Sequence, residues 1–187
     1  MKLVLLGGPG AGKGTQAAKL KNYYGIPHVS TGAILREARA SGTELGKKAA
    51  EYMDAGKLLP DDVILGIICI QLGMPSMERG FLFDGFPRTI LQAEGLDRLL
   101  KARNTALDAV VSIEVDDAVV VERLLKRAEI EGRSDDNRET IAERLRVYYE
   151  QTAPLKEYYQ KAGILKSVDG VGTIDEIFNR IVSILGG

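Results

Sequence analysis

The sequence contains almost none of the residues that form cross-links or hold structural metals. Cys69 is its only cysteine and His28 its only histidine. A single cysteine excludes an internal disulfide and a cysteine-based zinc site, so we expect no structural zinc. Cys69 stands among isoleucines, which predicts buried packing. His28 lies near the start of a predicted strand, which favours a structural role over a catalytic one.

A long hydrophobic segment and an excess of charge of one sign are also missing. The longest apolar run, residues 63–70, is interrupted by Gly66 and is too short to cross a bilayer. The N-terminus has no long apolar segment, which favours a cytoplasmic protein without a membrane partner. Lysine and arginine total 25 and aspartate and glutamate 26, so the net charge of −1 gives no general attraction to nucleic acid.

A glycine-rich segment near the start of the chain is the most informative feature present: Gly7-Gly8-Pro9-Gly10-Ala11-Gly12-Lys13-Gly14-Thr15. Gly7, Gly12 and Lys13 meet the spacing G-x-x-x-x-G-K, whereas Gly14 stands where serine or threonine is usual. An apolar run precedes the segment and a helical pattern follows it. Backbone N–H groups of such a turn can surround phosphates, and Lys13 can reach the outer ones. The alternative interpretation, a glycine-rich turn that binds no ligand, is disfavoured, because ordering each glycine costs conformational entropy that a bound ligand would offset.

Short apolar segments alternate with helical patterns along the chain. The expected strands are residues 2–6, 27–30, 80–84, 109–114 and 165–168. The expected helices are residues 13–24, 32–40, 43–55, 61–73, 89–101 and 116–126. Strands that are apolar throughout indicate burial on both faces. We therefore predict an α/β fold with a five-stranded parallel sheet wrapped by helices, in the three-layer arrangement of P-loop NTPases.

Two helix starts are visible in the C-terminal third. Asp136 followed by Glu139 predicts the cap of a long helix that runs to about Gln160, bent at Pro154. The segment Thr173-Ile174-Asp175-Glu176 reads as a capping box. An apolar stripe follows from it and predicts core packing. The stripe consists of Ile174, Ile177, Ile181 and Ile184.

The chain, residues 1–187, is expected to be one domain with two closing segments. Residues 31–59 form a block of short helices, and residues 128–137 (AEIEGRSDDN) form a polar connection flanked by arginines. Segments of this kind near a phosphate site are candidates for a flap and a lid. Residues 1–30, 60–127 and 138–187 then make up the core.

Further motifs surround the glycine segment. Asp84-Gly85-Phe86-Pro87-Arg88 follows the third strand, and Gln92 comes soon after. The others are Thr31-Gly32 with Arg36, Gly56-Lys57-Leu58, and the arginines Arg123, Arg127, Arg133 and Arg144. Together they resemble the adenylate kinases over essentially the whole chain. The short connection after Arg127 is similar to the short-lid form, which lacks the larger lid and its optional zinc site.

The resemblance implies reversible phosphoryl transfer from MgATP to AMP, giving two ADP and serving adenine nucleotide homeostasis. The residues agree with this chemistry independently. Two phosphate tails brought together need charge neutralisation and in-line placement, for which arginines are suited. No catalytic base is apparent, and a phosphate acceptor with a second pKa of about 6 is already largely ionised.

On the donor side, the resemblance implies that the glycine segment wraps the ATP phosphates and that Lys13 follows the transferred group. Arg123 would lie against the adenine, Arg127 would reach the phosphates, and the backbone near Gly172 would contact the base. The implied ATP-binding residues are Gly10, Ala11, Gly12, Lys13, Gly14, Thr15, Arg123, Arg127 and Gly172.

On the acceptor side, Arg36 and Arg88 would hold the AMP phosphate, and Arg133 and Arg144 would close at the transfer point. The remaining implied AMP-binding residues are Thr31, Lys57, Leu58, Leu59, Gly85, Phe86, Pro87 and Gln92. Asp84 would orient Mg²⁺ through water. The implied catalytic residues are Lys13, Arg88, Arg123, Arg133 and Arg144.

Plainer interpretations stay open for several of these residues. Arg123, Arg127 and Arg144 read as solvated helix charges when each is taken alone. Asp84 could cap the turn before Gly85, and Gln92 could be an exposed helix residue. The family usually has an acid after Thr31-Gly32, whereas this chain has Ala33, which points to altered tuning of the flap.

Two other functions remain alternatives. A kinase for UMP or CMP would share the phosphate sites, but Thr31, Gln92 and residues 56–59 favour AMP. A non-catalytic nucleotide switch would need a guanine-reading Asn-Lys-x-Asp element, which the sequence lacks. The site needs residues from one chain only, so we expect a monomer.

Overall fold

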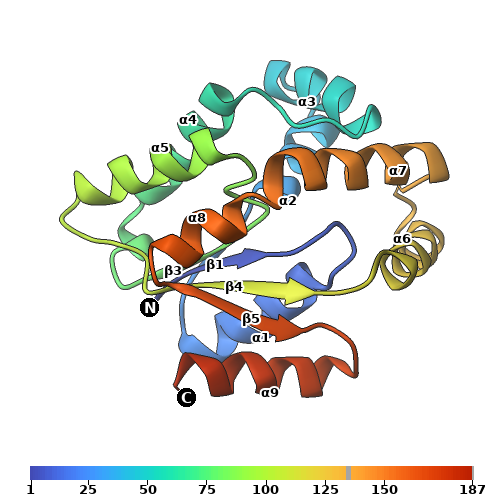
Figure 1. Cartoon of the computed structure of the whole chain (residues 1–187). Coiled ribbons are helices and arrows are strands. Elements are labelled where there is room, and N and C mark those ends of the chain that lie inside the picture. Colours follow the sequence, from blue (N-terminus) through green and yellow to red (C-terminus); the bar gives the residue numbers. More distant parts are fainter. Residues whose placement is uncertain (134–135, 187) are drawn as a thin grey trace.

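The computed structural model describes residues 1–133 and 136–186 (Figure 1). Five parallel strands form one sheet in the order β2-β3-β1-β4-β5, which confirms the predicted α/β fold. The strands are β1 (Lys2–Leu6), β2 (His28–Ser30), β3 (Phe81–Asp84), β4 (Ala109–Glu114) and β5 (Leu165–Asp169). Their bounds agree with the prediction to within one residue.

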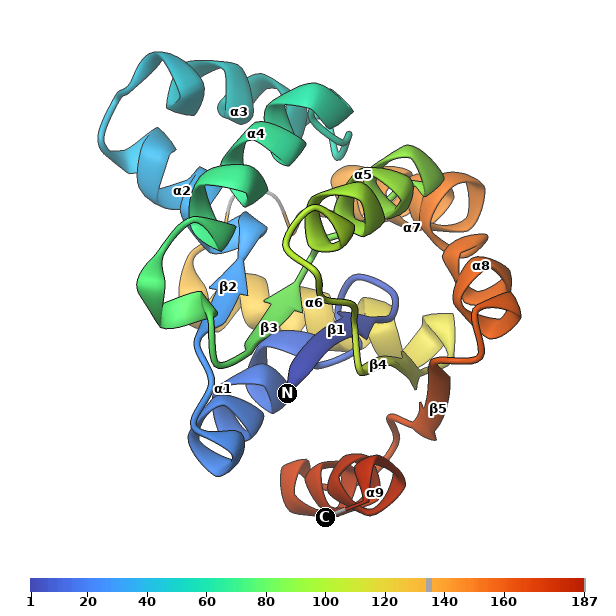
Figure 2. The same cartoon turned by 90° about the vertical axis from the view of Figure 1, so that its left-hand side faces the viewer.

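Helices cover both faces of this sheet. They are α1 (Lys13–Tyr24), α2 (Thr31–Ala40), α3 (Glu44–Asp54), α4 (Asp61–Leu72), α5 (Ile90–Lys101), α6 (Asp117–Glu131), α7 (Arg138–Val147), α8 (Leu155–Lys161) and α9 (Ile174–Leu185). A 3-10 turn (Pro75–Met77) and a π-helical turn (Tyr148–Thr152) complete the described elements. In Figures 1 and 2, α1 and α9 lie on one face, and α4, α5 and α8 lie on the other.

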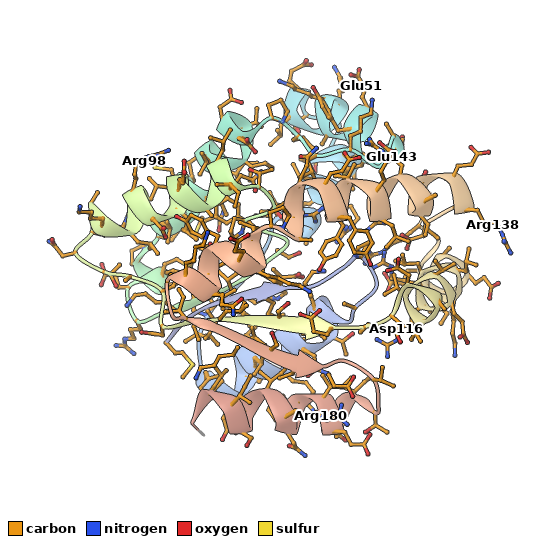
Figure 3. All side chains as sticks on the ribbon, viewed as in Figure 1. Glu51, Arg98, Asp116, Arg138, Glu143 and Arg180 are labelled. Atoms are coloured by element: carbon orange, nitrogen blue, oxygen red, sulfur yellow. The ribbon has the colours of Figure 1, made fainter. Side chains whose placement is uncertain are left out.

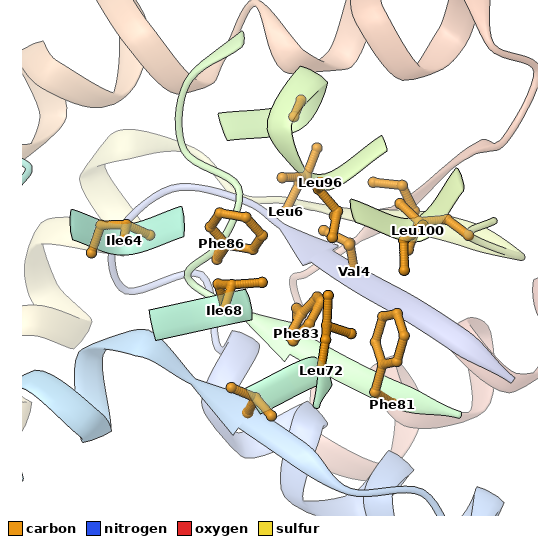
Figure 4. Close-up of a cluster of buried hydrophobic side chains, with 14 of the residues drawn as sticks. Val4, Leu6, Ile64, Ile68, Leu72, Phe81, Phe83, Phe86, Leu96 and Leu100 are labelled. Carbon is orange, nitrogen blue, oxygen red and sulfur yellow. The ribbon is translucent and has the colours of Figure 1, made fainter. Parts of the chain in front are cut away.

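The two layers of core follow from the alternation of side chains along the strands. In β1, Val4 and Leu6 join the larger cluster under α4, α5 and α8, while Leu3 and Leu5 join the cluster under α1 and α9. Figure 4 shows the larger cluster, in which Phe81, Phe83 and Phe86 pack against α4 and α5. The edge strand β5 departs from the expected two-sided burial, because Lys166 and Ser167 are exposed.

The central position of β1 determines where a ligand can bind. From β1 the chain runs to β2 on one side of it and returns to β3, and from β3 it crosses β1 to β4 on the other side, so the sheet has a topological switch point between β1 and β3. Ligands of open parallel sheets bind beyond the carboxyl ends of the strands at such a point. The glycine loop, residues 7–12, leaves β1 at that end.

The flap, residues 31–59, consists of the expected short helices, with α2 packed on α3. The end of its helix α3 contacts α7, which lies beside it above the sheet (Figure 1). The Thr140 hydroxyl donates a hydrogen bond to the Asp54 carbonyl at 3.3 Å. A Cβ at Gly56 would lie only 3.0 Å from the Thr140 carbonyl oxygen. The flap and α7 are thus in direct van der Waals contact.

The region after residue 126 differs from the prediction. Helix α6 continues to Glu131, so the first four residues of the segment 128–137 are helical, and Gly132 ends the helix with φ 62°. Residues 134 and 135 of the same segment lie outside the described residues. The long helix expected to run to Gln160 is broken into α7, the π-helical turn and α8. Pro154 stands at the N-cap of α8.

Three side chains are placed differently from the prediction. The N-cap of α7 is Asn137, whose side chain accepts from the Thr140 amide at 2.9 Å, and Asp136 does not cap the helix. Cys69 is exposed, because α4 buries the positions Ile64, Ile68 and Leu72 and position 69 faces away from them. Ile174 is 52 % exposed and thus lies outside the core stripe.

The capping box at Thr173 and Glu176 is confirmed, and Ile177 and Ile181 are buried as expected. Within the described part of the chain, no helix combines the length and apolar character that membrane crossing requires.

Candidate active site

Two adjoining cavities lie at the carboxyl edge of the sheet. The main cavity, of about 750 Å³, is bounded by the glycine loop, the end of β3 and the helices α6 and α7. The side cavity, of about 80 Å³, lies between α2, residues 56–59 and α5. Arg36, Arg88 and Arg144 line both cavities, so the two spaces meet at these three cations.

Every site residue predicted from the sequence, except Phe86, lines one of these cavities. Phe86 instead is fully buried in the core, with its ring 5.6 Å from that of Phe83. Its side chain therefore supports the strand end and does not line the site. The fold has brought together residues from positions as distant as Gly10 and Gly172.

The glycine loop folds over the side chain of Lys13. The Lys13 ammonium donates hydrogen bonds to the carbonyls of Gly7 at 2.7 Å and Gly8 at 2.8 Å. Position 10 requires glycine for two reasons: its φ is 81°, and a Cβ there would lie 2.9 Å from Leu124 Cγ. These contacts fix the conformation of the loop and place Lys13 at the N-terminus of α1.

Burial lowers the pKa of Lys13 to about 8. The carboxylate of Asp84 opposes this effect, while Arg88, Arg144 and Arg127 add to the lowering. A lysine surrounded by three guanidinium groups indicates a region that favours anions.

Asp84 ends β3 beside the glycine loop, where its Oδ2 is 3.7 Å from the position of a Cβ on Gly14. The His28 Nε2 lies 3.8 Å from the same oxygen, which is too long for a hydrogen bond. Burial raises the pKa of Asp84, but His28, Lys13 and Arg88 outweigh it and hold the pKa below its ordinary value. The carboxylate therefore stays ionised at neutral pH, and His28 reaches the cavity from the start of β2.

Asp136 lies at the centre of the arginine cluster between α6 and α7. It accepts from Arg127 Nε at 2.6 Å, from Arg127 Nη2 at 2.8 Å and from Arg144 Nη1 at 2.6 Å. Its side chain is fully buried, and Arg133 pairs with Glu131 nearby. Burial raises the pKa of Asp136, but the bonds from Arg127 and the charges of Arg127 and Arg144 lower it further than burial raises it.

Sequence reasoning missed this role for Asp136 because it treated the residue as a helix cap. One signal was available: Arg127, Arg133 and Arg144 flank an acidic pair, and closely placed arginines need a carboxylate when they are partly buried.

On the flap side, the Gly85 carbonyl is the point at which two side chains converge. Thr31 Oγ1 and Arg88 Nε each donate to it at 2.8 Å. The main chain of Arg88 is fixed as well, because its amide donates to Gln92 Oε1 at 2.8 Å and its carbonyl accepts from Thr152 Oγ1 at 2.8 Å. Thr152, supplied by the π-helical turn, is a second supporting residue that the sequence did not reveal.

Gln92 is 2 % exposed and lines the side cavity, so it is not a solvent-facing helix residue. Its Nε2 donates to Asp61 Oδ1 at 2.8 Å, and the Thr89 hydroxyl donates to the same oxygen at 2.9 Å. The amide is thereby fixed in orientation, and among the described residues its Nε2 has a single acceptor, so its second N–H points to no protein partner there. Such a group can present a fixed donor to a ligand in the side cavity.

The opposite wall of the main cavity is the β5–α9 turn. Arg123 Nη2 donates to the Gly170 carbonyl at 3.0 Å, and Gln16 Nε2 donates to the Ile174 carbonyl at 3.0 Å. Gly172 has φ 133° and lines the cavity. Arg123 and the turn thus border the same space from two sides.

A strand, a glycine loop and a helix, with a second cavity joined to the first through three arginines, define a P-loop nucleoside monophosphate kinase. The family model for adenylate kinase matches residues 5–164. Three proteins named adenylate kinase match nearly the whole chain. That of Parvibaculum lavamentivorans is 50 % identical over 100 % of this chain and 92 % of its own length. That of Xanthomonas euvesicatoria is 49 % identical over 100 % of this chain and 100 % of its own length. That of Archaeoglobus fulgidus is 46 % identical over 99 % of this chain and 98 % of its own length. The chain belongs to the adenylate kinase family.

Proposed function

We propose that the chain catalyses reversible phosphoryl transfer from MgATP to AMP, with the donor in the main cavity and the acceptor in the side cavity. The observation that carries this assignment is the junction of the two cavities at Arg36, Arg88 and Arg144. Two phosphate tails that enter from opposite sides meet there, among cations that offset their repulsion.

The donor phosphates lie, in this proposal, in the glycine loop from Gly10 to Thr15. Lys13 exchanges its bonds to the loop carbonyls for the outer phosphate oxygens. Arg127 approaches the same phosphates from α6, and Arg123 lies against the adenine, where a guanidinium makes a favourable cation–π contact.

The acceptor lies with its phosphate on Arg36 and Arg88 and with its base against the inner wall of the side cavity. That wall is formed by Thr31, Lys57, Leu58, Leu59 and Gln92. Gly85 and Pro87 border the passage between the cavities. The fixed N–H of Gln92 supplies a directional contact for the base, while Leu59 and Met53 supply apolar surface.

The residues at the junction work by charge and placement. An AMP phosphate that is largely ionised at neutral pH attacks the γ-phosphorus of ATP without a general base, and the ADP oxygen leaves in line. Arg88, Arg133, Arg144 and Lys13 offset the charge that moves between the tails. Asp136 keeps Arg127 and Arg144 at fixed positions, so little reorganisation is needed when the transition state forms.

The residues present suit a magnesium ion that arrives with the nucleotide. No group of three or more histidine, cysteine, aspartate or glutamate side chains among the described residues could hold a metal without further ligands. Mg²⁺ commonly takes one or two protein oxygens together with phosphate oxygens and water. Asp84, through water, and the Thr15 hydroxyl would hold it. The bound ion neutralises phosphate charge.

The flap (31–59) and the lid (128–137) are proposed to close over the two nucleotides and exclude water, and one chain is proposed to be sufficient. A bisubstrate mimic that left both segments in their ligand-free positions in a crystal structure would contradict closure.

A panel of acceptors tests the proposed function. The purified chain, supplied with MgATP and each of AMP, CMP, UMP and GMP, should form ADP rapidly with AMP alone, as measured by chromatography. Preference for UMP or CMP would move the chain to the pyrimidine kinases. Release of inorganic phosphate with AMP left unchanged would contradict phosphoryl transfer altogether.

A further inference from the structure

The turn between β5 and α9, residues 170–173, borders the main cavity and has two glycines among its four residues. Glycine backbones have the most conformational freedom to lose, so the order of this turn has to come from outside it. Its amide and carbonyl groups show the source. The Gly170 amide donates to the Glu114 carbonyl at 2.7 Å, and the Gly170 carbonyl accepts from Arg123 at 3.0 Å.

Arg180, on α9, holds the middle of the turn (Figure 3). Its Nη1 donates to the Asp169 carbonyl at 2.9 Å and to the Val171 carbonyl at 2.6 Å. Its Nη2 lies 3.5 Å from the position of a Cβ on Gly172, so the guanidinium is directly against that residue. The Glu176 carboxylate accepts from the Thr173 amide at 2.7 Å and fixes the end of the turn.

Gly172 differs from the other residues of the turn in its backbone hydrogen bonds. The Val171 amide donates to the Asp169 side chain, and the Thr173 carbonyl accepts from the Ile177 amide. In the described part of the chain, Gly172 is then the residue of the turn whose N–H and C=O both have no partner. Backbone groups beside a cavity need a partner, and a flat nitrogen heterocycle carries matching donors and acceptors along its edge.

We propose that Arg180 is a positioning residue for the donor nucleotide: it fixes the carbonyls of Asp169 and Val171, just before Gly172, so that the peptide groups of Gly172 are presented to the donor base. This inference rests on the proposed function, which puts the donor in the main cavity. Arg180 itself touches no nucleotide. It acts through the turn, and its effect is confined to the base, because the triphosphate is held at the glycine loop.

The test compares ATP with inorganic tripolyphosphate, which has the phosphates but no base. Arg180→Met keeps the aliphatic stem and removes the donors. We expect the Kd for ATP, measured by calorimetry without AMP, to rise about tenfold, which corresponds to about 1.4 kcal/mol. The Kd for tripolyphosphate, the KM for AMP and kcat at saturating ATP should be unchanged. Arg180→Lys, which retains a cationic donor, should recover part of the ATP affinity.

Arg98→Met is the matched control, because Arg98 is an exposed arginine on α5, far from the turn (Figure 3). A selective loss of ATP affinity in Arg180→Met, absent in Arg98→Met, supports the proposal. An unchanged affinity for ATP, or equal weakening of both ligands, overturns it. If Arg180→Met does not fold, as judged by its thermal transition, Arg180→Gln is subjected to the same comparison. Failure of the wild-type chain to form ADP would refute the proposed function, whereas the two binding constants would still decide the role of Arg180.

Discussion

Arg127 and Asp136 form a two-point ion pair, with N–O distances of 2.6 and 2.8 Å, whose carboxylate is fully buried. The pair joins the end of α6 to the start of α7. Arg144 completes it from α7 through a third bond of 2.6 Å. Two arginines of the proposed phosphate site are therefore held by one carboxylate that no phosphate needs to contact.

Asp136→Asn should damage both stability and catalysis. The amide is similar in size but removes the negative charge that Arg127 and Arg144 share, and breaking a buried pair costs about 3 kcal/mol at the low end of measured values. The low end applies because the side chains of the two arginines are 25 % and 19 % exposed, so water screens part of the charge. Urea unfolding measures the loss of stability, and kcat should fall about tenfold for each 1.4 kcal/mol of transition-state stabilisation that is lost. Asp62→Asn, at an exposed site, should change neither quantity.

Ionisation of Asp136 should account for part of the loss of folding stability in acid. The pKa of Asp136 in the folded chain is below the value of about 3.9 expected for an unfolded aspartate. Its contribution to stability is therefore fully present above about pH 4 and is lost as the pH falls through the folded-state pKa. Between about pH 5 and pH 2, the free energy of unfolding of Asp136→Asn should depend less steeply on pH than that of the wild type. Parallel curves would show that Asp136 does not contribute.

Nucleotide binding should be accompanied by proton uptake near pH 8. Lys13 has its pKa lowered to about 8 by burial, so a fraction of it is neutral in the free protein at that pH. The phosphates of ATP favour the charged ammonium and raise the pKa again. Calorimetric titrations in buffers of different ionisation enthalpy should detect the uptake at pH 8 and much less at pH 6. In Lys13→Met the buffer dependence should disappear.

Arg88→Ala should reduce turnover strongly with little effect on folding. Arg88 borders both cavities, and the loss of one donor aimed at transition-state charge typically costs about 10²- to 10³-fold in kcat. Steady-state rates with MgATP and AMP measure the loss, and the thermal midpoint controls for folding. Arg98→Ala provides the surface control. Wild-type activity in Arg88→Ala would remove this residue from the proposed site.

Gln92→Glu should weaken acceptor binding selectively. The substitution removes the Nε2 donor and places a second carboxylate beside Asp61, whose Oδ1 is 2.8 Å from Gln92 Nε2. Like charges at this distance repel each other, and the N–H available to a base is lost. The KM for AMP should rise while the KM for ATP stays unchanged. An equal rise in both constants would argue for a general loss of structure.

The parts of the molecule that could be predicted are those encoded locally. The strand bounds follow from short apolar runs, and the glycine loop from residue spacing. The capping box at Thr173 and Glu176 is contained in four consecutive residues. Cys69 and Ile174 were misplaced because an apolar neighbourhood in sequence does not say which side of a helix faces the core.

The supporting contacts of the site could not be predicted for a different reason. Thr152 reaches the Arg88 carbonyl across 64 positions of sequence, and Gln16 reaches Ile174 across 158. Such bonds depend on tertiary geometry, which no local pattern reports. The same holds for Asp136, whose partners are closer in sequence. The local pattern predicts a helix cap there, but the side chain instead pairs with Arg127 and Arg144, which the fold brings next to it.

The hydrogen bond from Thr140 to the Asp54 carbonyl joins the flap directly to α7. Swinging the flap outward severs that hydrogen bond and parts Gly56 from α7 in the same movement. In the proposed function, in which the flap opens to admit AMP, that opening would also break the contact with α7, the helix that bears Arg144, and would change both cavities that Arg144 lines.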